Sequence, residues 1–286
     1  MAPDDLLLVG DDALAAVTEV RRACAEHDGA DPLDEAAHLR LKHDGLAGTD
    51  AWVTRDGFAL RRGAEVDLAV APPARENGLG GRLAELACLE PGKISAWSHG
   101  DHPAAARLAD RLGFAREREL WVMRRPSALP LPPVDPPPGV LIRDYGDRDA
   151  AALLEVNGAA FAHHPEQGAM DQAGLAERMA EPWFDPAGLL LAVGDDGELL
   201  GFHWTKQHDD ATGEVYVIGI SPAAQGHGLG RVLTLAGLHH LAARGVDQVL
   251  LYVESDNSAA LRLYDGLGFT HAAADTHVQY RRAGRS

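Results

Sequence analysis

The sequence predicts an α/β protein in which one domain occurs twice. Residues 65–89 and 214–241 each give a strand, a glycine-rich turn and a helical pattern, in that order. Their turns correspond residue by residue, as Arg75-x-x-Gly78-x-Gly80 and Gln225-x-x-Gly228-x-Gly230. Such a repeat indicates two copies of one folding unit. Between the copies, residues 126–138 hold so many prolines that they can form neither a helix nor a central strand, so we expect a semi-rigid spacer there.

The spacer sets the expected domain boundaries. We predict an N-terminal domain over residues 1–125, a proline-rich linker over 126–139 and a C-terminal domain over 140–286.

The apolar periodicity and the turn residues predict the elements of each half. In the N-terminal half these are helices over 11–27 and 34–41, a hairpin at Asp56-Gly57, a strand over 65–70, a helix through Leu83 and Leu86, and a strand over 94–97. In the C-terminal half they are a strand over 140–143, helices over 149–161 and near 174–179, a hairpin at Asp195-Asp196-Gly197, a strand over 214–220, a helix through Leu233 and Leu241, and a strand over 249–253.

Composition excludes several classes of protein. The chain has 286 residues and a formal charge of -17, which repels nucleic acid and anionic membranes. Its two cysteines, Cys24 and Cys88, form neither a metal-type pair nor a disulfide framework, which favours a reducing cytoplasm. No run of roughly 18 apolar residues and no signal-peptide pattern is present. The pair His99-x-x-His102 lacks a third ligand, so we expect no metal.

The turn from Gln225 to Arg231 is suited to binding a phosphate. It exposes backbone N–H groups at a helix start, where the positive end of the helix dipole lies. No Gly-Lys-Ser/Thr follows, and glycines at 226, 228 and 230 do not fit the dinucleotide pattern. A plain tight turn is the alternative. Gln225-x-x-Gly228-x-Gly230 resembles the acetyl-CoA pyrophosphate loop of the GCN5-related N-acetyltransferase (GNAT) superfamily.

Two further segments support this resemblance, because Asn257 and the run Leu263–Phe269 match the superfamily's next motif. The resemblance implies a tandem duplication of the GNAT fold. Each copy would have a central mixed, mostly antiparallel sheet flanked by helices.

Acetyl transfer from a thioester to an amine needs a base for the amine and an acid for the leaving thiolate. Glu214, at a strand start, and Tyr264 can fill these roles, although an exposed carboxylate and a packed ring are the simpler explanations. At the corresponding positions the first copy has Ala64 and Ala109. We therefore predict that the N-terminal domain is degenerate and non-catalytic, and that the C-terminal domain is catalytic.

The sequence also resembles a narrower family, the mycothiol synthases. This resemblance implies acetyl transfer from acetyl-CoA to the cysteinyl amine of cysteinyl-glucosaminyl-inositol, the last step of mycothiol biosynthesis. It is carried by these segments: Phe161–Gly168, Trp183–Pro186, Gly201–Lys206, Gly213–Val217 and Leu250–Asn257. It implies catalysis by Glu214 as base and Tyr264 as acid. The implied contacts with the acceptor are Glu35, Glu166, Lys206, Glu214 and Tyr252.

The same resemblance implies the residues that contact acetyl-CoA. In the second half these are Ile218, Gly219, Ile220, Gln225, Gly226, His227, Gly228, Leu229, Gly230, Arg231, Asn257, Ser258, Ala259, Ala260, Leu261 and Arg262. A second site in the first half would use Leu68, Ala69, Val70, Arg75, Glu76, Asn77, Gly78, Leu79 and Gly80. Acetyl-CoA and the small thiol precursor are the expected partners of a monomer, with no metal, nucleic acid or membrane.

Two alternatives stay open at this point. The acceptor can be a protein N-terminus or another small amine, because Asn257 to Phe269 also resembles such acetyltransferases. The chain can also be a CoA-binding protein without turnover, but the presence of Glu214 and Tyr264 counts against this. Mass spectrometry of candidate acceptors incubated with acetyl-CoA distinguishes all three.

Overall fold

The computed structural model of the chain describes residues 7–89, 92–162 and 167–284. Two compact units divide these residues, and each is described by itself. The first unit takes the chain up to Trp121, Glu254–Asp256 and the residues from Ala272 onward. The second takes Val122–Val253 and Asn257–His271.

The elements of the first unit are α1 (Gly10–Asp28), α2 (Glu35–Asp44), β1 (Asp50–Thr54), β2 (Gly57–Arg62), β3 (Glu65–Val70), the 3₁₀ turn η2 (Pro72–Ala74), α3 (Leu79–Ala87), β4 (Ile94–Ser98), α4 (Pro103–Leu112), and parts of β5 (Ala115–Pro126) and β11 (Thr270–Arg282). Those of the second are β6 (Val140–Asp144), η3 (Asp147–Asp149), α5 (Ala150–Ala160), η4 (Gln167–Ala169), α6 (Gln172–Met179), η5 (Pro186–Gly188), β7 (Leu189–Gly194), β8 (Leu199–Gln207), β9 (Thr212–Ile220), η6 (Pro222–Ala224), α7 (Leu229–Ala243), β10 (Gln248–Glu254) and α8 (Ser258–Asp265).

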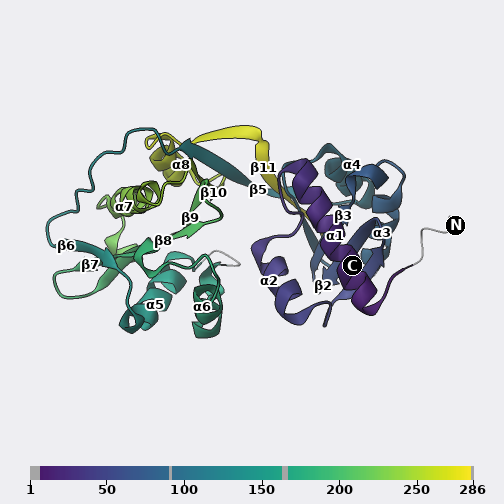
Figure 1. The fold of residues 1–286 in the computed structure, drawn as a ribbon, viewed down its shortest axis with the longest axis horizontal. Helices are drawn as coiled ribbons and strands as arrows, with labels where there is room; N and C mark the ends of the chain where they lie inside the picture. The colour runs from purple at the N-terminus through teal and green to yellow at the C-terminus, as the bar shows by residue number, and fades with distance from the viewer. Residues whose placement is uncertain (1–6, 90–91, 163–166, 285–286) are drawn as a thin grey trace. The chain divides into compact units, whose positions relative to one another are not determined.

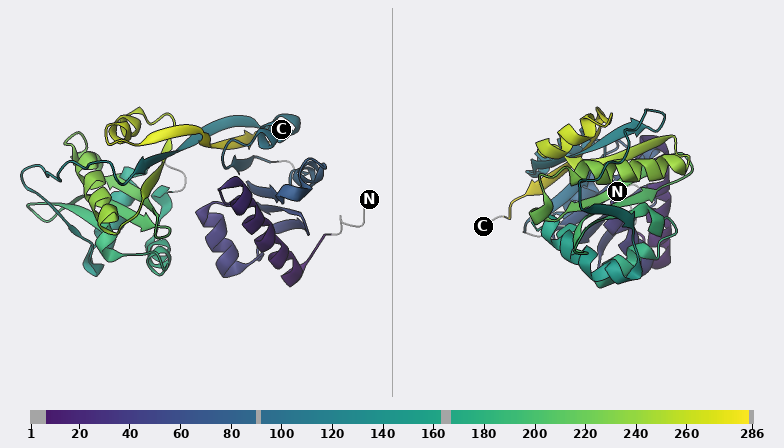
Figure 2. Two further views of the ribbon diagram at one scale, coloured as in Figure 1. Left: turned by 45° about the horizontal axis from the view of Figure 1, so that its top comes forward. Right: turned by 90° about the vertical axis from the view of Figure 1, so that its left-hand side faces the viewer.

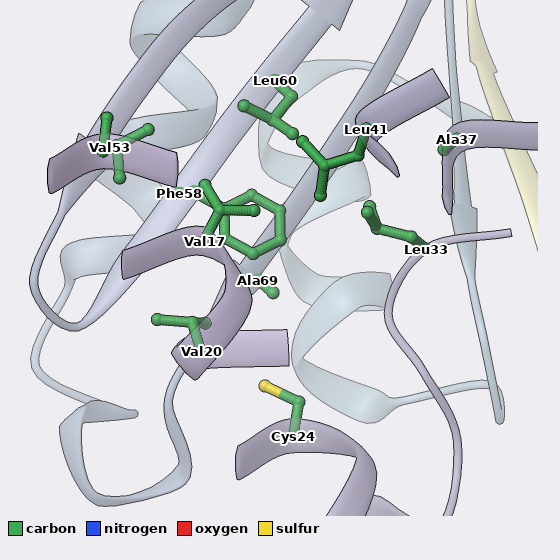
Figure 3. Packing of buried hydrophobic residues seen from close by; sticks show 11 residues of the cluster. Val17, Val20, Cys24, Leu33, Ala37, Leu41, Val53, Phe58, Leu60 and Ala69 are labelled. Carbon is green, nitrogen blue, oxygen red and sulfur yellow. The ribbon is translucent and has the colours of Figure 1, made fainter. Parts of the chain in front are cut away.

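In the first unit, helices cover both faces of the strands. Successive residues of β2 point to opposite faces, as the pleat requires. Phe58 and Leu60 pack against α1 and α2, in a cluster that includes Val17 and Cys24 (Figure 3). Ala59, between them in sequence, packs with Leu83 of α3 on the other face. The apolar residues predicted to form this half therefore make two hydrophobic layers around one sheet.

The second unit repeats this layering. Leu189 and Leu191 of β7 belong to the cluster that includes Leu153 of α5. Leu190 and Ala192 face the opposite way and pack with Leu233 and Ala236 of α7. Figure 1 shows α5 and α7 on opposite sides of β7 and β8. Strand β7 has both faces buried, which explains why the sequence there is a continuous apolar run without alternation.

The strands follow one hydrogen-bonded order, β1-β2-β3-β4-β11-β5-β10-β9-β8-β7-β6. Strands β5 and β11, which are neighbours in this order (Figure 2), each contribute residues to both compact units. The sequence predicted a separate sheet in each half. The tandem arrangement holds, but the pairing runs on through all 11 strands.

Strand β11 explains this difference. Its residues Val278 to Arg282 pair antiparallel with β4, from Val278 opposite Ser98 to Arg282 opposite Ile94. Val278 and Tyr280 also pack with Ala109 of α4. The end of the chain therefore completes the first unit, which a division in chain order at 126–139 does not anticipate.

Most individual elements agree with the sequence. The hairpin predicted at Asp56-Gly57 is formed by β1 and β2, and β3 has the predicted bounds. The second predicted hairpin is β7 and β8, with a bulge between Ala192 and Val193. Among the described residues, no helix is both long and apolar enough to cross a bilayer.

Candidate active site

The glycine turn of the second unit joins β9 to α7. Pro222 ends the strand and begins η6, and the amide of Gln225 donates from Nε2 to the Ile220 carbonyl at 3.5 Å. Gly226 and Gly228 then adopt φ of +83° and +79°, which L side chains rarely do. Both glycines are exposed. Glycine adopts this left-handed backbone without strain at both positions, and the turn presents its backbone to solvent.

Helix α7 begins directly after the turn, with Gly228 as its N-cap. Its first helical bonds run from the N–H groups of Arg231 and Val232 to the Gly228 carbonyl, at 3.1 and 3.2 Å. No side chain caps this helix start. The N–H groups of Leu229 and Gly230, which precede these bonds, have no acceptor within the helix, so they and the helix dipole favour an anion such as a pyrophosphate.

The strand before the turn has an open edge. Strand β10 pairs in parallel with β9 from Gln248 opposite Thr212 to Leu251 opposite Val215. Beyond Val215 the described register contains no further pair with β10, although β9 continues to Ile220. The backbone groups on that edge can hydrogen-bond an extended ligand in the manner of an added strand. A Cβ at Gly219 would lie 2.5 Å from the Phe202 ring, so only glycine fits there.

The first unit reproduces the turn closely. Arg75 donates from Nε to the Val70 carbonyl at 3.0 Å, as Gln225 does to Ile220. Gly78 is the N-cap of α3 with φ +79°, the value found at Gly228. Strand β3 pairs with β4 only at Glu65 opposite Ser95, so its edge is also open.

Two side chains distinguish this first turn from the second. Glu76 occupies the position of Gly226 and has a positive φ of +65°, which is strained for glutamate. Arg75 binds Asp28 through both guanidinium nitrogens, at 2.8 and 2.5 Å, and that contact holds the pKa of Asp28 below its usual value. The cation of this turn is thus neutralised within the unit, and a carboxylate is added beside the anion-binding backbone.

One backbone hydrogen bond, present in both units, shows which residue of the first unit corresponds to Tyr264. The Phe114 N–H donates to the Ala109 carbonyl at 2.9 Å, and the Phe269 N–H donates to the Tyr264 carbonyl at 3.0 Å. Ala109 is therefore the structural counterpart of Tyr264, as the sequence repeat indicated. Since alanine has no ionisable group, the first unit has no acid at this position.

Glu214 lies near the start of β9 and is buried, with its side chain 7% exposed. Its Oε2 atom is 2.6 Å from Nε2 of His208, the residue that follows β8. In the register of the sheet Glu214 stands opposite Lys206. A carboxylate inside the protein needs such a polar partner, because unpaired burial of a charge is costly.

Aromatic rings surround Lys206 on the same face of the sheet. Its Nζ lies 4.8 Å from the centroid of the Trp183 ring and 5.2 Å from that of Tyr216. Arg178 of α6 donates from Nε to the Tyr216 hydroxyl at 3.1 Å. Such cation–π contacts hold the lysine stem in place. The register of β8 and β9 shifts between Trp204 and Thr205, where Tyr216 has no partner across the ladder, and the Tyr216 ring contacts the Lys206 ammonium there.

Tyr264 lies on α8, whose N-cap Asn257 accepts a hydrogen bond from the Ala260 N–H at 3.1 Å. The ring of Tyr264 meets that of Phe269 edge to face at 5.7 Å. Burial raises the pKa of Tyr264 to about 12. Its hydroxyl therefore stays protonated at neutral pH. No hydrogen bond between Tyr264 and Glu214 occurs among the described residues.

The other predicted acceptor residues belong to separate elements of the chain. Tyr252 is 43% exposed on β10, in the second unit. Glu35 is the first residue of α2, in the first unit. Glu166 lies outside the described residues. The structure brings together Glu214 and Lys206, and it adds His208, Tyr216, Trp183 and Arg178, which sequence reasoning did not select. Within the described ranges, no group of three or more His, Cys, Asp or Glu side chains is arranged to hold a metal.

Comparison with known proteins gives the class. The sequence profile of the Acetyltransferase (GNAT) family matches residues 154–269. A GCN5-related N-acetyltransferase from Sphaerobacter thermophilus superposes with a TM-score of 0.69 at 24% identity, over 96% of this chain and 94% of that one. A tandem GNAT protein from the clavulanic acid biosynthesis pathway gives 0.69 at 20% identity, over 98% of both chains. The predicted tandem GNAT fold is confirmed, and the chain is an acetyl-CoA-dependent acetyltransferase.

Curated relatives define the family more closely. A mycothiol acetyltransferase from Nocardioides sp. is 60% identical over 290 residues, which cover 95% of this chain and 98% of the relative. One from Thermobispora bispora is 48% identical over 93% of this chain and 95% of its own. The chain belongs to the mycothiol acetyltransferase family.

Proposed function

We propose that the second unit transfers the acetyl group of acetyl-CoA to the cysteinyl amine of cysteinyl-glucosaminyl-inositol, the last step of mycothiol formation. The observation that carries this proposal is the buried carboxylate of Glu214 beside the open edge of β9. A buried base on the strand that leads into an anion-binding turn is what acetyl transfer from acetyl-CoA to an amine requires. The relatives named mycothiol acetyltransferase support the choice of acceptor.

Acetyl-CoA would bind along β9 and the turn that follows it. Its pyrophosphate suits the N–H groups of Gln225 to Arg231 at the start of α7. Its extended arm suits the open edge from Ile218 to Ile220, and Asn257 to Arg262, which follow β10 in the chain, would contact it from α8. A backbone N–H of that edge can donate to the acetyl carbonyl as negative charge develops on its oxygen.

Proton transfer would then fall to two side chains. The acceptor ammonium, whose pKa is near 8, passes a proton to Glu214, so that the amine nitrogen can attack the thioester carbon. Tyr264 donates a hydrogen bond to the thiolate as the carbon–sulfur bond breaks. The acceptor ammonium loses two protons as the amide forms: the first leaves through Glu214 to solvent, and the second, lost from nitrogen after the attack, accounts for the proton that reaches sulfur. The products are therefore the amide, CoA thiol and one released proton.

The acceptor's hydroxyl groups would meet the polar residues near Glu214. Lys206 is the first of these, and its ammonium is held in place by Trp183 and Tyr216. Glu35, Glu166 and Tyr252 stay predictions as acceptor contacts. A site built to hydrogen-bond a hydroxyl-rich ligand rejects analogues that lack those groups.

The first unit would have a supporting role without catalysis. Ala109 replaces the acid, and Ala64 stands where the repeat requires the base. Its turn can still bind a second acetyl-CoA through Leu68 to Val70 and Arg75 to Gly80, although Glu76 weakens such binding. We also propose that the enzyme is a cytoplasmic monomer that needs no metal. Light scattering and activity in the presence of a chelator test the last two points.

An acceptor assay tests the proposal. Release of CoA thiol and the mass of the product would be measured with cysteinyl-glucosaminyl-inositol, free cysteine and a peptide N-terminus. We expect the first to be preferred in kcat/KM by at least 10²-fold, because the other two leave polar groups of the site unpaired. Comparable values for the pseudo-disaccharide and the peptide would refute the acceptor and favour a protein acetyltransferase.

Two variants test the assigned side chains. Glu214→Gln should lower kcat by about 10²–10⁴-fold, the usual contribution of a general base. Glu198→Gln is the matched control, since Glu198 is exposed in the turn before β8. Lys206→Met should raise the KM of the acceptor while leaving that of acetyl-CoA unchanged. An equal rise in both constants would contradict the placement of Lys206 on the acceptor side.

A further inference from the structure

We infer that His208 is a positioning residue for the reaction, which acts by fixing the carboxylate of Glu214. This inference rests on the proposed function, because it assumes that Glu214 is the base. The contact that points to it is the 2.6 Å distance from His208 Nε2 to Glu214 Oε2. No second side-chain hydrogen bond of Glu214 occurs in the described part of the chain.

The chemistry of the pair fixes the direction of the hydrogen bond. A carboxylate can only accept, so Nε2 of His208 carries the hydrogen and donates it to Oε2. Oε1 of Glu214 is then left for the proton of the acceptor amine. Carboxylates with one oxygen held in this way lose rotational freedom, and the free oxygen keeps one orientation.

The loop that carries His208 is itself held rigidly. The His208 N–H donates to the Thr212 carbonyl at 2.9 Å, which closes the connection between β8 and β9. Within it, Oδ1 of Asp209 accepts from the N–H groups of Ala211 and Thr212 at 2.8 and 2.7 Å. These backbone donors hold the pKa of Asp209 below its usual value. The turn is therefore ordered by its own residues.

Two hydrogen bonds also connect the C-cap of α7, Arg244, through Gln207 to this turn. Arg244 donates from Nε to Oε1 of Gln207 at 3.2 Å, and Nε2 of Gln207 donates to the Asp209 carbonyl at 3.0 Å. Gln207, the last residue of β8 and the neighbour of His208, is therefore hydrogen-bonded both to Arg244 and to the turn itself. An imidazole supported in this way can keep the buried carboxylate in one orientation between turnovers.

Burial adds a reason why Glu214 needs this partner. The carboxylate is 7% exposed, whereas the imidazole is 35% exposed. Water can therefore solvate His208 but reaches Glu214 poorly, and the histidine N–H replaces the lost hydration of Oε2. Lys206 is opposite Glu214 in register, but its ammonium lies against Trp183 and Tyr216.

A double-mutant cycle tests the inference. His208→Ala should lower kcat about 10- to 100-fold, the range expected when a reacting group loses its orientation. The KM of acetyl-CoA should not change. His208→Gln keeps an N–H donor at similar reach and should recover part of the loss. In a Glu214→Gln background, His208→Ala should cause no further loss, because both changes disable the same group.

The controls separate this inference from the proposed function. His239→Ala, which removes a surface imidazole bonded to the Pro132 carbonyl, should leave kcat unchanged. Unaltered kcat in both His208 variants, or losses that multiply in the double variant, would overturn the positioning role while leaving Glu214 as base. Full activity of Glu214→Gln alone would overturn both. If His208→Ala does not fold, His208→Gln alone and combined with Glu214→Gln decides the question.

Discussion

Replacing Tyr264 by phenylalanine removes one hydroxyl group and keeps the ring that packs edge to face on Phe269. Burial raises the pKa of Tyr264 to about 12, whereas a thiol has a pKa of about 8.5. Complete proton transfer from this phenol to a free thiolate is therefore uphill by roughly 3.5 pK units, or about 5 kcal/mol. The hydroxyl should act as a hydrogen-bond donor to the developing thiolate, more than as a full acid.

The size of the effect follows from that role. A hydrogen bond to a charged group contributes about 1.5–3 kcal/mol, which corresponds to roughly 10- to 150-fold in rate. We expect Tyr264→Phe to lower kcat within this range and to leave the KM of acetyl-CoA unchanged. The assay is the release of CoA thiol at saturating substrates. Tyr145→Phe is the matched control, since Tyr145 is a buried tyrosine in the core of the same unit.

The pH dependence provides a second measurement. The protonated, neutral form of Tyr264 is the one that can donate, and its raised pKa keeps that form present to higher pH. At any pH below about 10, ionisation of Tyr264 should therefore not reduce kcat. A loss of kcat near pH 9 that disappears in Tyr264→Phe would refute the raised pKa of Tyr264. A loss beyond 10⁴-fold in the variant would instead indicate full proton transfer. A loss below 3-fold would remove Tyr264 from the mechanism.

Three further predictions concern the two turns and a buried acid. Burial first, and then the charge of Asp34, raise the pKa of Asp67 to about 7, so the free energy of unfolding should fall as the pH rises from about 4 to 7. Asp67→Asn should abolish this pH dependence, as measured by urea unfolding, and should raise the free energy of unfolding by on the order of 2–4 kcal/mol at pH 8. Glu76→Gly relieves roughly 1–2 kcal/mol of strain from the left-handed backbone of Glu76, but glycine also makes the unfolded chain more flexible. The two effects partly cancel, so the free energy of unfolding should rise by at most about 1 kcal/mol. Gly228→Ala should raise the KM of acetyl-CoA, whereas Gly245→Ala, with the same strain at φ +85° beyond α7, should not.

Local signals made much of the fold predictable. Glycine and proline act through the φ angles of single residues, so the turn at Asp56-Gly57 and the two turns before α3 and α7 could be placed from sequence. The repeat then gave the correspondence of Ala109 with Tyr264, which one backbone hydrogen bond in each unit reproduces. These features depend on neighbours in the chain.

Long-range features were not predictable in the same way. Nothing in the residues of β11 specifies that Val278 lies opposite Ser98, because strand pairing across most of the chain depends on the completed fold. His208 likewise stands in a polar turn without periodicity, and only the register of β8 and β9 brings it to Glu214. The two aromatic residues that contact Lys206, Trp183 and Tyr216, come from separate segments of the chain, so the sequence motifs that contain them did not show that they meet.

The pairing of β4 with β11 has a consequence for biosynthesis. A ribosome releases the residues of β4 early, but their partner strand emerges only after the entire second unit has been translated. The backbone N–H and C=O groups on that edge of β4 therefore stay unpaired, exposed or covered by a chaperone, until β11 has left the exit tunnel. A nonsense mutation that removed the residues from Ala272 onward would spare every residue assigned to acetyl transfer, yet it would leave β4 of the first unit without its partner strand.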